Sequence, residues 1–247
     1  MNPYESDKLL SEYLLFHYGT EVDILGAKPG PREALDFAVR CVTELLGPAM
    51  ISADATALDI GCAVGRSSFE LARHVASVTG IDFSHRFIEA ATALQQTGKL
   101  ETFKIEEGEI TTPFIARVPS GLDRSRVRFA QGDAMALPAD QPPCDILLAA
   151  NLICRLPDPQ KFLARLPSLI KPGGQLLLTT PFTWLADFTP PEHWLGGRGQ
   201  KKSFVTLREI LKSDFELQHT QDMPFLIREH ARKYQYGIAL GSRWIRN

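Results

Sequence analysis

The sequence lacks any long apolar run and any dense run of basic residues. No stretch reaches the roughly 18 consecutive apolar residues of a membrane-spanning helix. The first residues have no apolar core like that of a signal peptide. The formal net charge is -2, and a nucleic acid needs a basic stripe that neutralises its phosphates. We therefore expect a cytoplasmic protein that acts on a small molecule, with no membrane and no nucleic acid as partner.

Cysteine is also scarce. The chain has 4 cysteines in 247 residues, with no CxxC pair and no histidine at metal-ligand spacing. Two disulfides would be possible in a secreted protein, but a chain of this length can bury a sizeable core without them. The sequence therefore predicts no metal site, and it predicts free, buried thiols at Cys41, Cys62, Cys144 and Cys154.

Short apolar runs alternate with helical patterns from residue 57 onward. This alternation is typical of βαβ units on a parallel sheet. The predicted fold is α/β, with a Rossmann-like doubly wound sheet of seven strands that is mostly parallel and has an antiparallel hairpin at one edge. The predicted strands are 57–60, 78–81, 127–130, 146–150, 175–180, 215–221 and 234–240, and the predicted helices are 66–75, 84–96 and 158–169.

Two segments fall outside this alternation. Residues 1–50 are helical in pattern and rich in aromatics, and residues 98–126 form an insertion where a short loop would normally join a helix to the next strand. Loops of that length are uncommon unless they are functional or partly structured. We expect a single domain over residues 1–247, with both segments covering the carboxyl ends of the strands, where open α/β sheets bind ligands.

A glycine turn follows the first predicted strand, in the sequence Asp59-Ile60-Gly61-Cys62-Ala63-Val64-Gly65. Glycine lets the backbone approach a ligand and adopt conformations barred to other residues. A dinucleotide site would have G-x-G-x-x-G, whereas the spacing here is G-x-x-x-G with an acid two residues before the first glycine. Asp59 would repel a pyrophosphate but suits the ammonium of a methionine moiety, directly or through water. An ordinary tight turn is the alternative interpretation.

Polar residues also end the next three strands. Asp82 lies 23 residues after Asp59 and could accept hydrogen bonds from two ribose hydroxyls, or alternatively cap the next helix. Asp133 could accept from an adenine amino group, and Asn151 ends the fourth strand. The predicted cofactor-binding residues are Asp59, Gly61, Cys62, Ala63, Gly65, Asp82, Phe83, Gly132, Asp133, Ala134 and Asn151.

These residues resemble the class I S-adenosylmethionine (SAM)-dependent methyltransferases, whose pattern has acids after the first two strands, glycines after the first and Asp-Ala near the third. Lys171-Pro172-Gly173-Gly174 also looks like that family's turn into its fifth strand. The resemblance covers about residues 55–181 and implies SAM as cofactor and S-adenosylhomocysteine as product. Ala63 stands where the family often has glycine, and its methyl group should narrow the turn without blocking it.

A closer resemblance extends along the whole chain. Residues 4–19, 63–73, 80–91, 149–159, 194–197 and 222–229 look like the methyltransferase module of ovothiol biosynthesis. That family often carries the module fused behind an iron-dependent sulfoxide synthase, so a separate synthase could act upstream in the pathway. The resemblance implies methylation of an imidazole nitrogen of mercaptohistidine. The alternatives are a methyltransferase for another small amino acid or imidazole, and a SAM-binding regulatory protein without catalysis.

Methyl transfer from a sulfonium is an in-line displacement, for which an enzyme mainly aligns the reacting groups in a dry pocket. A neutral imidazole nitrogen is already a nucleophile, so no strong base is required. A cationic donor should hold the substrate carboxylate, and Glu106, Glu107 or Glu109 could face its ammonium or imidazole. The predicted catalytic residues are Asn151 and Tyr18, and the predicted substrate-binding residues are Tyr13, His17, Arg155, Phe182 and Trp184.

Each of these substrate-side assignments has a simpler alternative. Arg155 could be a surface arginine, and acidic loop residues are often only solvated. Tyr13, His17 and Tyr18 share one helical face, so they either close the pocket or pack as an amphipathic cover. Aromatic side chains in loops are also used simply for packing.

Overall fold

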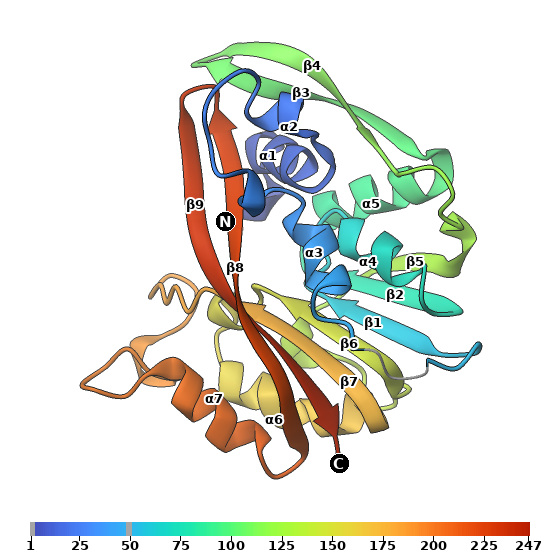
Figure 1. Cartoon of the computed structure of the whole chain (residues 1–247), viewed down its shortest axis with the longest axis vertical. Coiled ribbons are helices and arrows are strands. Elements are labelled where there is room, and N and C mark those ends of the chain that lie inside the picture. Colours follow the sequence, from blue (N-terminus) through green and yellow to red (C-terminus); the bar gives the residue numbers. More distant parts are fainter. Residues whose placement is uncertain (1–2, 48–50) are drawn as a thin grey trace.

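The computed structural model describes residues 3–47 and 51–247, and a seven-stranded sheet forms its centre (Figure 1). The strand order is β5-β2-β1-β6-β7-β9-β8. The first five of these strands pair in parallel, and β9 is antiparallel to both of its neighbours. The predicted α/β fold class is therefore confirmed. The strands are β1 (Thr56–Ile60), β2 (Ser77–Asp82), β5 (Val127–Gln131), β6 (Cys144–Ala150), β7 (Ile170–Thr180), β8 (Phe215–His230) and β9 (Lys233–Arg246).

The central strands are apolar along their length because both of their faces are covered. In β6, Leu147 packs into one core cluster, whereas Ile146 and Leu148 pack into the other. Successive side chains of a strand point to opposite faces, so this alternation gives one core on each side of the sheet. The core that contains Ile146 and Leu148 is covered by α3 (Phe37–Thr43), α4 (Arg66–Leu71) and α5 (His85–Thr97). The core that contains Leu147 is covered by α6 (Pro159–Leu169) and α7 (Ser203–Leu211).

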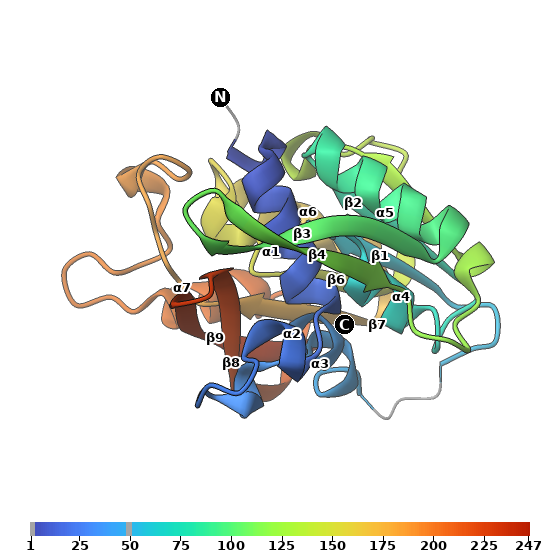
Figure 2. The same ribbon diagram turned by 90° about the horizontal axis from the view of Figure 1, so that it is seen from above.

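The described part of the N-terminal segment, residues 3–47, is helical, and residues 1–2 and 48–50 of the predicted segment lie outside the described residues. It forms η1 (Pro3–Glu5), α1 (Asp7–Tyr18), α2 (Glu21–Ile24) and η2 (Arg32–Ala34) before α3. The insertion folds into an antiparallel hairpin of β3 (Lys99–Glu107) and β4 (Ile110–Arg117), which lies across α1 when the molecule is seen from above (Figure 2). Further short helices are η3 (Arg124–Arg126), η4 (Ala134–Ala136), η5 (Ile153–Arg155) and η6 (Pro191–His193).

Besides the β3–β4 hairpin, the structure differs from the predicted elements at four places. The helix after the glycine turn ends at Leu71, because the residues that follow form turns. Strand β7 begins at Ile170 and includes Pro172-Gly173-Gly174, where its register against β6 shifts. Helix α7 was not predicted, and β8 and β9 are much longer than expected, with 16 and 14 residues. Pro224 is tolerated inside β8 because this strand lies at the sheet edge.

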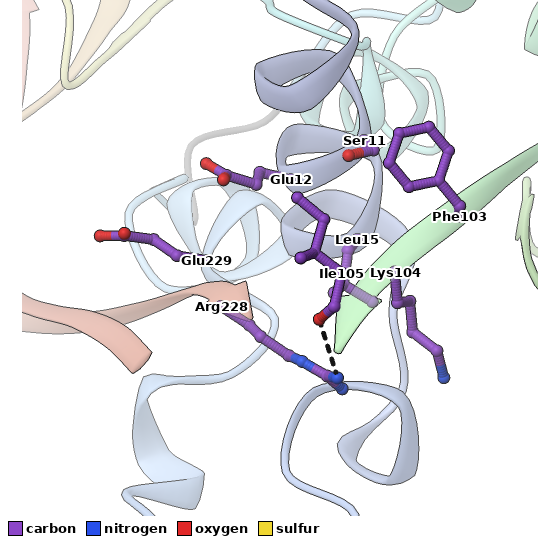
Figure 3. Close-up of a pocket in the computed structure, with 8 residues that line it drawn as sticks. All are labelled: Ser11, Glu12, Leu15, Phe103, Lys104, Ile105, Arg228 and Glu229. Atoms are coloured by element: carbon purple, nitrogen blue, oxygen red, sulfur yellow. Dashed lines mark hydrogen bonds between the residues drawn. The ribbon is translucent and has the colours of Figure 1, made fainter. Parts of the chain in front are cut away.

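The outer half of the β8–β9 hairpin, residues 223–239, extends past the end of β7 and runs beside α1 and α2 (Figure 1). Arg228 of β8 connects this half of the hairpin to α2 and β3 (Figure 3). Its Nη1 donates to the Asp23 carbonyl at 2.7 Å, and its Nη2 donates to Glu106 at 2.7 Å and to the Ile105 carbonyl at 3.4 Å. The side chain of Arg228 is 7% exposed, so a buried cation fastens β8 to α2 and β3.

None of the described helices is long and apolar enough to span a membrane. The four cysteines are free and buried, as predicted.

Candidate active site

The carboxyl ends of β1, β2 and β5 are tied together by backbone hydrogen bonds. Gly61 N donates to the Ile81 carbonyl at 2.8 Å, and Gly132 N donates to the Asp82 carbonyl at 2.9 Å. The loop after β6 joins them, because a Cβ on Gly61 would lie 3.0 Å from Leu152 Cδ1. The structure therefore brings the predicted cofactor residues of four strands to one edge of the sheet.

The glycine turn has three residues in the left-handed region: Gly61 at φ +77°, Ala63 at +47° and Gly65 at +83°. A Cβ on Gly65 would also lie 2.4 Å from the Phe129 ring, so both space and conformation require glycine there. Ala63 holds its unusual conformation while its N–H donates to Asp82 Oδ2 at 2.9 Å. The Cys62 side chain is buried, so only the backbone of this residue faces the turn.

Asp59 is completely buried beneath the turn. Its Oδ2 accepts hydrogen bonds from Ser67 Oγ at 2.7 Å and from Ser68 Oγ at 2.6 Å, both in the first turn of α4. Its Oδ1 is buried and has no partner. Burial raises the pKa of this carboxyl to about 6, although the two serine hydroxyls act in the opposite direction. An unpaired buried carboxylate oxygen is unfavourable, and a cationic donor from a ligand would satisfy it.

Asp82 is held by backbone amides. Its Oδ2 accepts from Ala63 N and its Oδ1 accepts from Ser84 N at 2.9 Å. Burial raises its pKa. The helix cap considered as an alternative belongs to Ser84, whose hydroxyl accepts from Phe87 N. Each carboxylate oxygen has a further lone pair, so Asp82 can still accept from two ligand hydroxyls.

The end of β5 is open to solvent. Asp133 is exposed, and its Oδ1 accepts from Met135 N at 2.8 Å as the cap of η4, which leaves Oδ2 for a ligand. Ala134 is half-buried beside it. The Phe83 ring at the end of β2 is 57% exposed, and an exposed ring is a surface on which a planar base can stack.

Asn151 and Phe182 end β6 and β7 in the left-handed region, at φ +51° and +50°. Asn151 is fixed by Thr179, because its N–H donates to the Thr179 carbonyl at 2.9 Å and to the Thr179 hydroxyl at 3.0 Å. Residues other than glycine keep this conformation only where surrounding contacts impose it, and such residues cluster at functional sites.

Helix α1 lies directly on the loops after β1 and β2. Tyr18 Oη donates to the Val64 carbonyl at 2.8 Å, and Ser84 Oγ donates to the Tyr4 carbonyl at 3.1 Å. Burial raises the pKa of Tyr18 well above its usual value, so its hydroxyl stays protonated. Burial, together with the charge of Arg66, lowers the pKa of His17 to about 3. The His17 imidazole is therefore neutral at physiological pH.

Aromatic rings line the space between α1 and the loop after β7. The Tyr13 ring lies 4.9 Å from Phe87 and 5.9 Å from Tyr4, and Tyr4 in turn lies 6.3 Å from Phe188 (centroid distances). The Arg155 guanidinium lies over Phe188 at 5.0 Å. Arg155 and Asp82 are both close enough to Tyr13 for their charges to affect its pKa, which burial raises.

Arg155 also donates to the Thr183 carbonyl at 2.9 Å. The structure thus brings Tyr13 and Arg155 together, whereas the indole N–H of Trp184 is bound to Ser203 of α7 at 2.9 Å. The sequence patterns assigned neither Phe188 nor Tyr4 to the site. Phe188 has no motif around it that could have identified it.

Glu106, one of three acids that could face the substrate, is paired with Arg228 at 2.7 Å. Glu107 and Glu109 are exposed at the turn of the β3–β4 hairpin. These three acids therefore belong to the hairpin and its junction.

Residues 58–178 match the family model of a methyltransferase domain. The ubiquinone biosynthesis O-methyltransferase of Leptothrix cholodnii is 26% identical over 181 residues, covering 68% of this chain and 67% of that protein. The protein of the same name from Coxiella burnetii is 31% identical over 124 residues, which cover 50% of this chain and 42% of that relative. This chain therefore matches less than half the length of the Coxiella protein.

Among solved structures, the N-methyltransferase NodS from Bradyrhizobium japonicum, in complex with S-adenosyl-L-homocysteine, is similar with a TM-score of 0.50. The identity is 19% over 79% of each chain, so this likeness concerns the fold alone.

Proposed function

We propose that this chain is a SAM-dependent methyltransferase that methylates a ring nitrogen of mercaptohistidine, since residues 58–178 match the family model of a methyltransferase domain. The whole-chain resemblance to the ovothiol module supports this substrate. The observation that carries the proposal is the position of Arg155. Its guanidinium stands against the Phe188 ring at 5.0 Å and close to Tyr13. A cation among aromatic rings suits a small aromatic amino acid that has a carboxylate.

The cofactor side of the proposal rests on groups that fit SAM. Asp59 offers a buried, unpartnered carboxylate oxygen to the ammonium, and Asp82 offers lone pairs to the ribose hydroxyls. Asp133 and Phe83 suit the adenine. Bound SAM supplies a methyl group on a sulfonium, which an in-line nucleophile can accept.

The residues of the chain then have to orient the imidazole and exclude water. Tyr13 and Phe182 would wall the ring, with Tyr4 and Phe188 completing the wall. Tyr18 would hold α1 on the glycine turn through its hydrogen bond to the Val64 carbonyl. The neutral His17 and the engaged Tyr18 provide no strong base, which agrees with a neutral imidazole as nucleophile. Asn151 would contact the bound ligands at the end of β6.

The test is a competition between equal amounts of mercaptohistidine and histidine, with the product identified by mass spectrometry and the methyl position by NMR. A site shaped for the thiolate leaves donors unpaired when histidine binds, so kcat/KM should differ by about 100-fold or more. Equal turnover, or a methyl group on sulfur, would show the substrate assignment to be wrong.

Arg155→Met gives a matched test of the carboxylate contact. It should lower kcat/KM for mercaptohistidine by about 10- to 100-fold, the scale of a charge-assisted hydrogen bond. SAM affinity should not change. Mercaptohistidine without its carboxyl group should be an equally poor substrate for the wild type and for Arg155→Met. Arg198→Met, on the exposed loop, is the control. An Arg155→Met enzyme with normal kcat/KM would exclude the contact.

O-methylation of a quinol is a second candidate, because the curated relatives are named as ubiquinone biosynthesis O-methyltransferases. A phenol is a poor nucleophile until it loses its proton, so this reaction needs a base. Incubation with SAM and a short-chain demethylated ubiquinol distinguishes the two candidates. Turnover of the quinol without turnover of mercaptohistidine would establish the second.

A further inference from the structure

Thr179 is fully buried near the end of β7, and its hydroxyl makes two hydrogen bonds to Asn151. The Oγ1 accepts from Asn151 N at 3.0 Å and donates to Asn151 Oδ1 at 3.0 Å. A hydroxyl has a single proton, so the proton of Thr179 is committed to Asn151.

The donated proton decides which way the Asn151 amide points, because an inverted amide would bring its NH₂ hydrogens against the proton of Thr179 Oγ1. The carbonyl oxygen of Asn151 therefore faces Thr179, and the NH₂ group points away from Thr179. No described residue accepts a hydrogen bond from this NH₂ group.

We propose that Thr179 is a positioning residue that makes Asn151 a hydrogen-bond donor toward the substrate. Arg155, four residues later, is also only a donor. The end of β6 thus presents donors alone, which suits an anionic or acceptor group of the substrate and disfavours a cationic one. Under the proposed function, on which this inference rests, the group is the carboxylate or the thiolate of mercaptohistidine.

The first experiment needs no turnover. In the ligand-free protein, the two side-chain amide protons of Asn151 are followed by ¹H–¹⁵N NMR and assigned by their loss in Asn151→Asp. Both protons should exchange rapidly with solvent in the wild type, because neither is bound to a described residue. Protection of one of the two would mean that the amide is inverted, and would overturn the inference whatever the substrate is.

The second experiment compares Thr179→Val, which removes the hydroxyl at nearly constant shape, with Thr179→Ser, which keeps it. Thr179→Val should raise the KM for mercaptohistidine by about 10-fold, because an amide free to rotate loses the net value of one hydrogen bond. The value of kcat and the Kd for SAM should change less than about threefold, and Thr179→Ser should restore KM. An equal rise in KM with both substitutions would indicate a packing role for Thr179 and overturn the inference. A change in the SAM Kd alone would mean that Asn151 contacts the cofactor and not the substrate.

Asn151→Asp keeps the bond to Thr179 and replaces the donor by a carboxylate, so it remains informative if Thr179→Val does not fold. Mercaptohistidine binding to the enzyme saturated with S-adenosylhomocysteine should weaken by at least about 10-fold, because the new charge faces an anion. Unchanged or tighter binding would contradict a donor role. Failure of the wild type to turn over mercaptohistidine would remove the proposed function but leave the NMR result valid.

Discussion

The carboxylates of Asp59 and Asp82 lie at the same edge of the sheet but are held by different groups. Two serine hydroxyls of α4 bind Asp59, whereas backbone amides of the glycine turn and of the residue before α5 bind Asp82. Serine hydroxyls can reorient, and backbone amides cannot. We therefore expect Asp82 to be the more rigid acceptor, and Asp59 to respond more to pH.

Replacing Asp82 should weaken the binding of SAM and also loosen the glycine turn. Asp82→Ala should reduce the affinity by about 1.5–3 kcal/mol, the value of hydrogen bonds to a charged group. Isothermal titration calorimetry measures the loss, and Asp140→Ala, at an exposed loop position, is the control. Unchanged affinity in a folded Asp82→Ala protein would exclude its contact with the ribose.

The affinity for SAM should depend on the protonation of Asp59. The pKa of this carboxyl is about 6, so below that pH it is neutral and loses its attraction for the ammonium. The affinity should therefore fall as the pH is lowered from 7.5 to 5. Asp59→Asn should abolish this dependence. Ser68→Ala should move the midpoint to higher pH, because the Ser68 hydroxyl stabilises the charged form of Asp59. A pH-independent affinity in the wild type would contradict a direct pairing.

At the scale of secondary-structure elements, the best predicted parts were those with local signals. Apolar runs bounded by turn residues identified the central strands, and Ser84 and Asp158 cap the helices that follow them. The β3–β4 hairpin was not predicted, because Phe114 and Ala116 are its only buried positions within β4 and most of its residues are exposed or half-buried. Its pairing depends on α1 and β8, which are distant in sequence.

The same reason explains the length of β8 and β9. Residues 223–230 contain proline and several charges, which are typical of a loop, yet Arg228 is buried by contacts to Asp23 and Glu106. No local sequence pattern predicts that Arg228 will bind Asp23, which lies 205 residues earlier in the chain. In the site, the strand-end acids could be predicted from their spacing, whereas Phe188 and the Thr179–Asn151 pair could not, because only the folded chain brings their partners together.

Replacing Arg228 should weaken the contacts that hold β8 to α2 and β3. Arg228→Met leaves Glu106 without its buried partner and should lower the free energy of unfolding by about 3 kcal/mol. Chemical denaturation measures this, and a double-mutant cycle with Glu106→Gln isolates the pair. The substitution Arg232→Met, at an exposed residue of the hairpin turn, should have little effect. A loss as large in Arg232→Met would mean that any charge change in this hairpin is destabilising.

For the molecule as a whole, stability should depend on Glu12, a carboxyl of α1 that is 4% exposed. Burial, and to a lesser extent the charge of Glu229, raises its pKa from 4.5 to about 7. The folded state therefore binds the proton more tightly than the unfolded state does. Below pH 4.5 this carboxyl does not reduce the free energy of unfolding. Its destabilising effect grows as the pH rises from 4.5 to about 7 and is complete above pH 7.

Glu12→Gln removes that effect. The variant should melt a few degrees higher than the wild type at pH 8, at about 2–4 °C for each kcal/mol regained. At pH 5 the two proteins should melt within about 1 °C of each other. Differential scanning calorimetry at both pH values measures this, with Glu216→Gln at an exposed position of β8 as control. A variant that is less stable at pH 8 would mean that the charged form of Glu12 is held favourably.

The strand order of the sheet also has a consequence for biosynthesis. Strand β9, which leaves the ribosome after all the others, lies between β7 and β8. When β8 emerges it has no neighbour in the main sheet, and its apolar residues Met223 and Leu226 must wait for β9. Helix α1 is made first, but it packs against β8 and so cannot complete its interface until this late stage. Nascent chains that stall before β9 should therefore expose both surfaces and depend on chaperones.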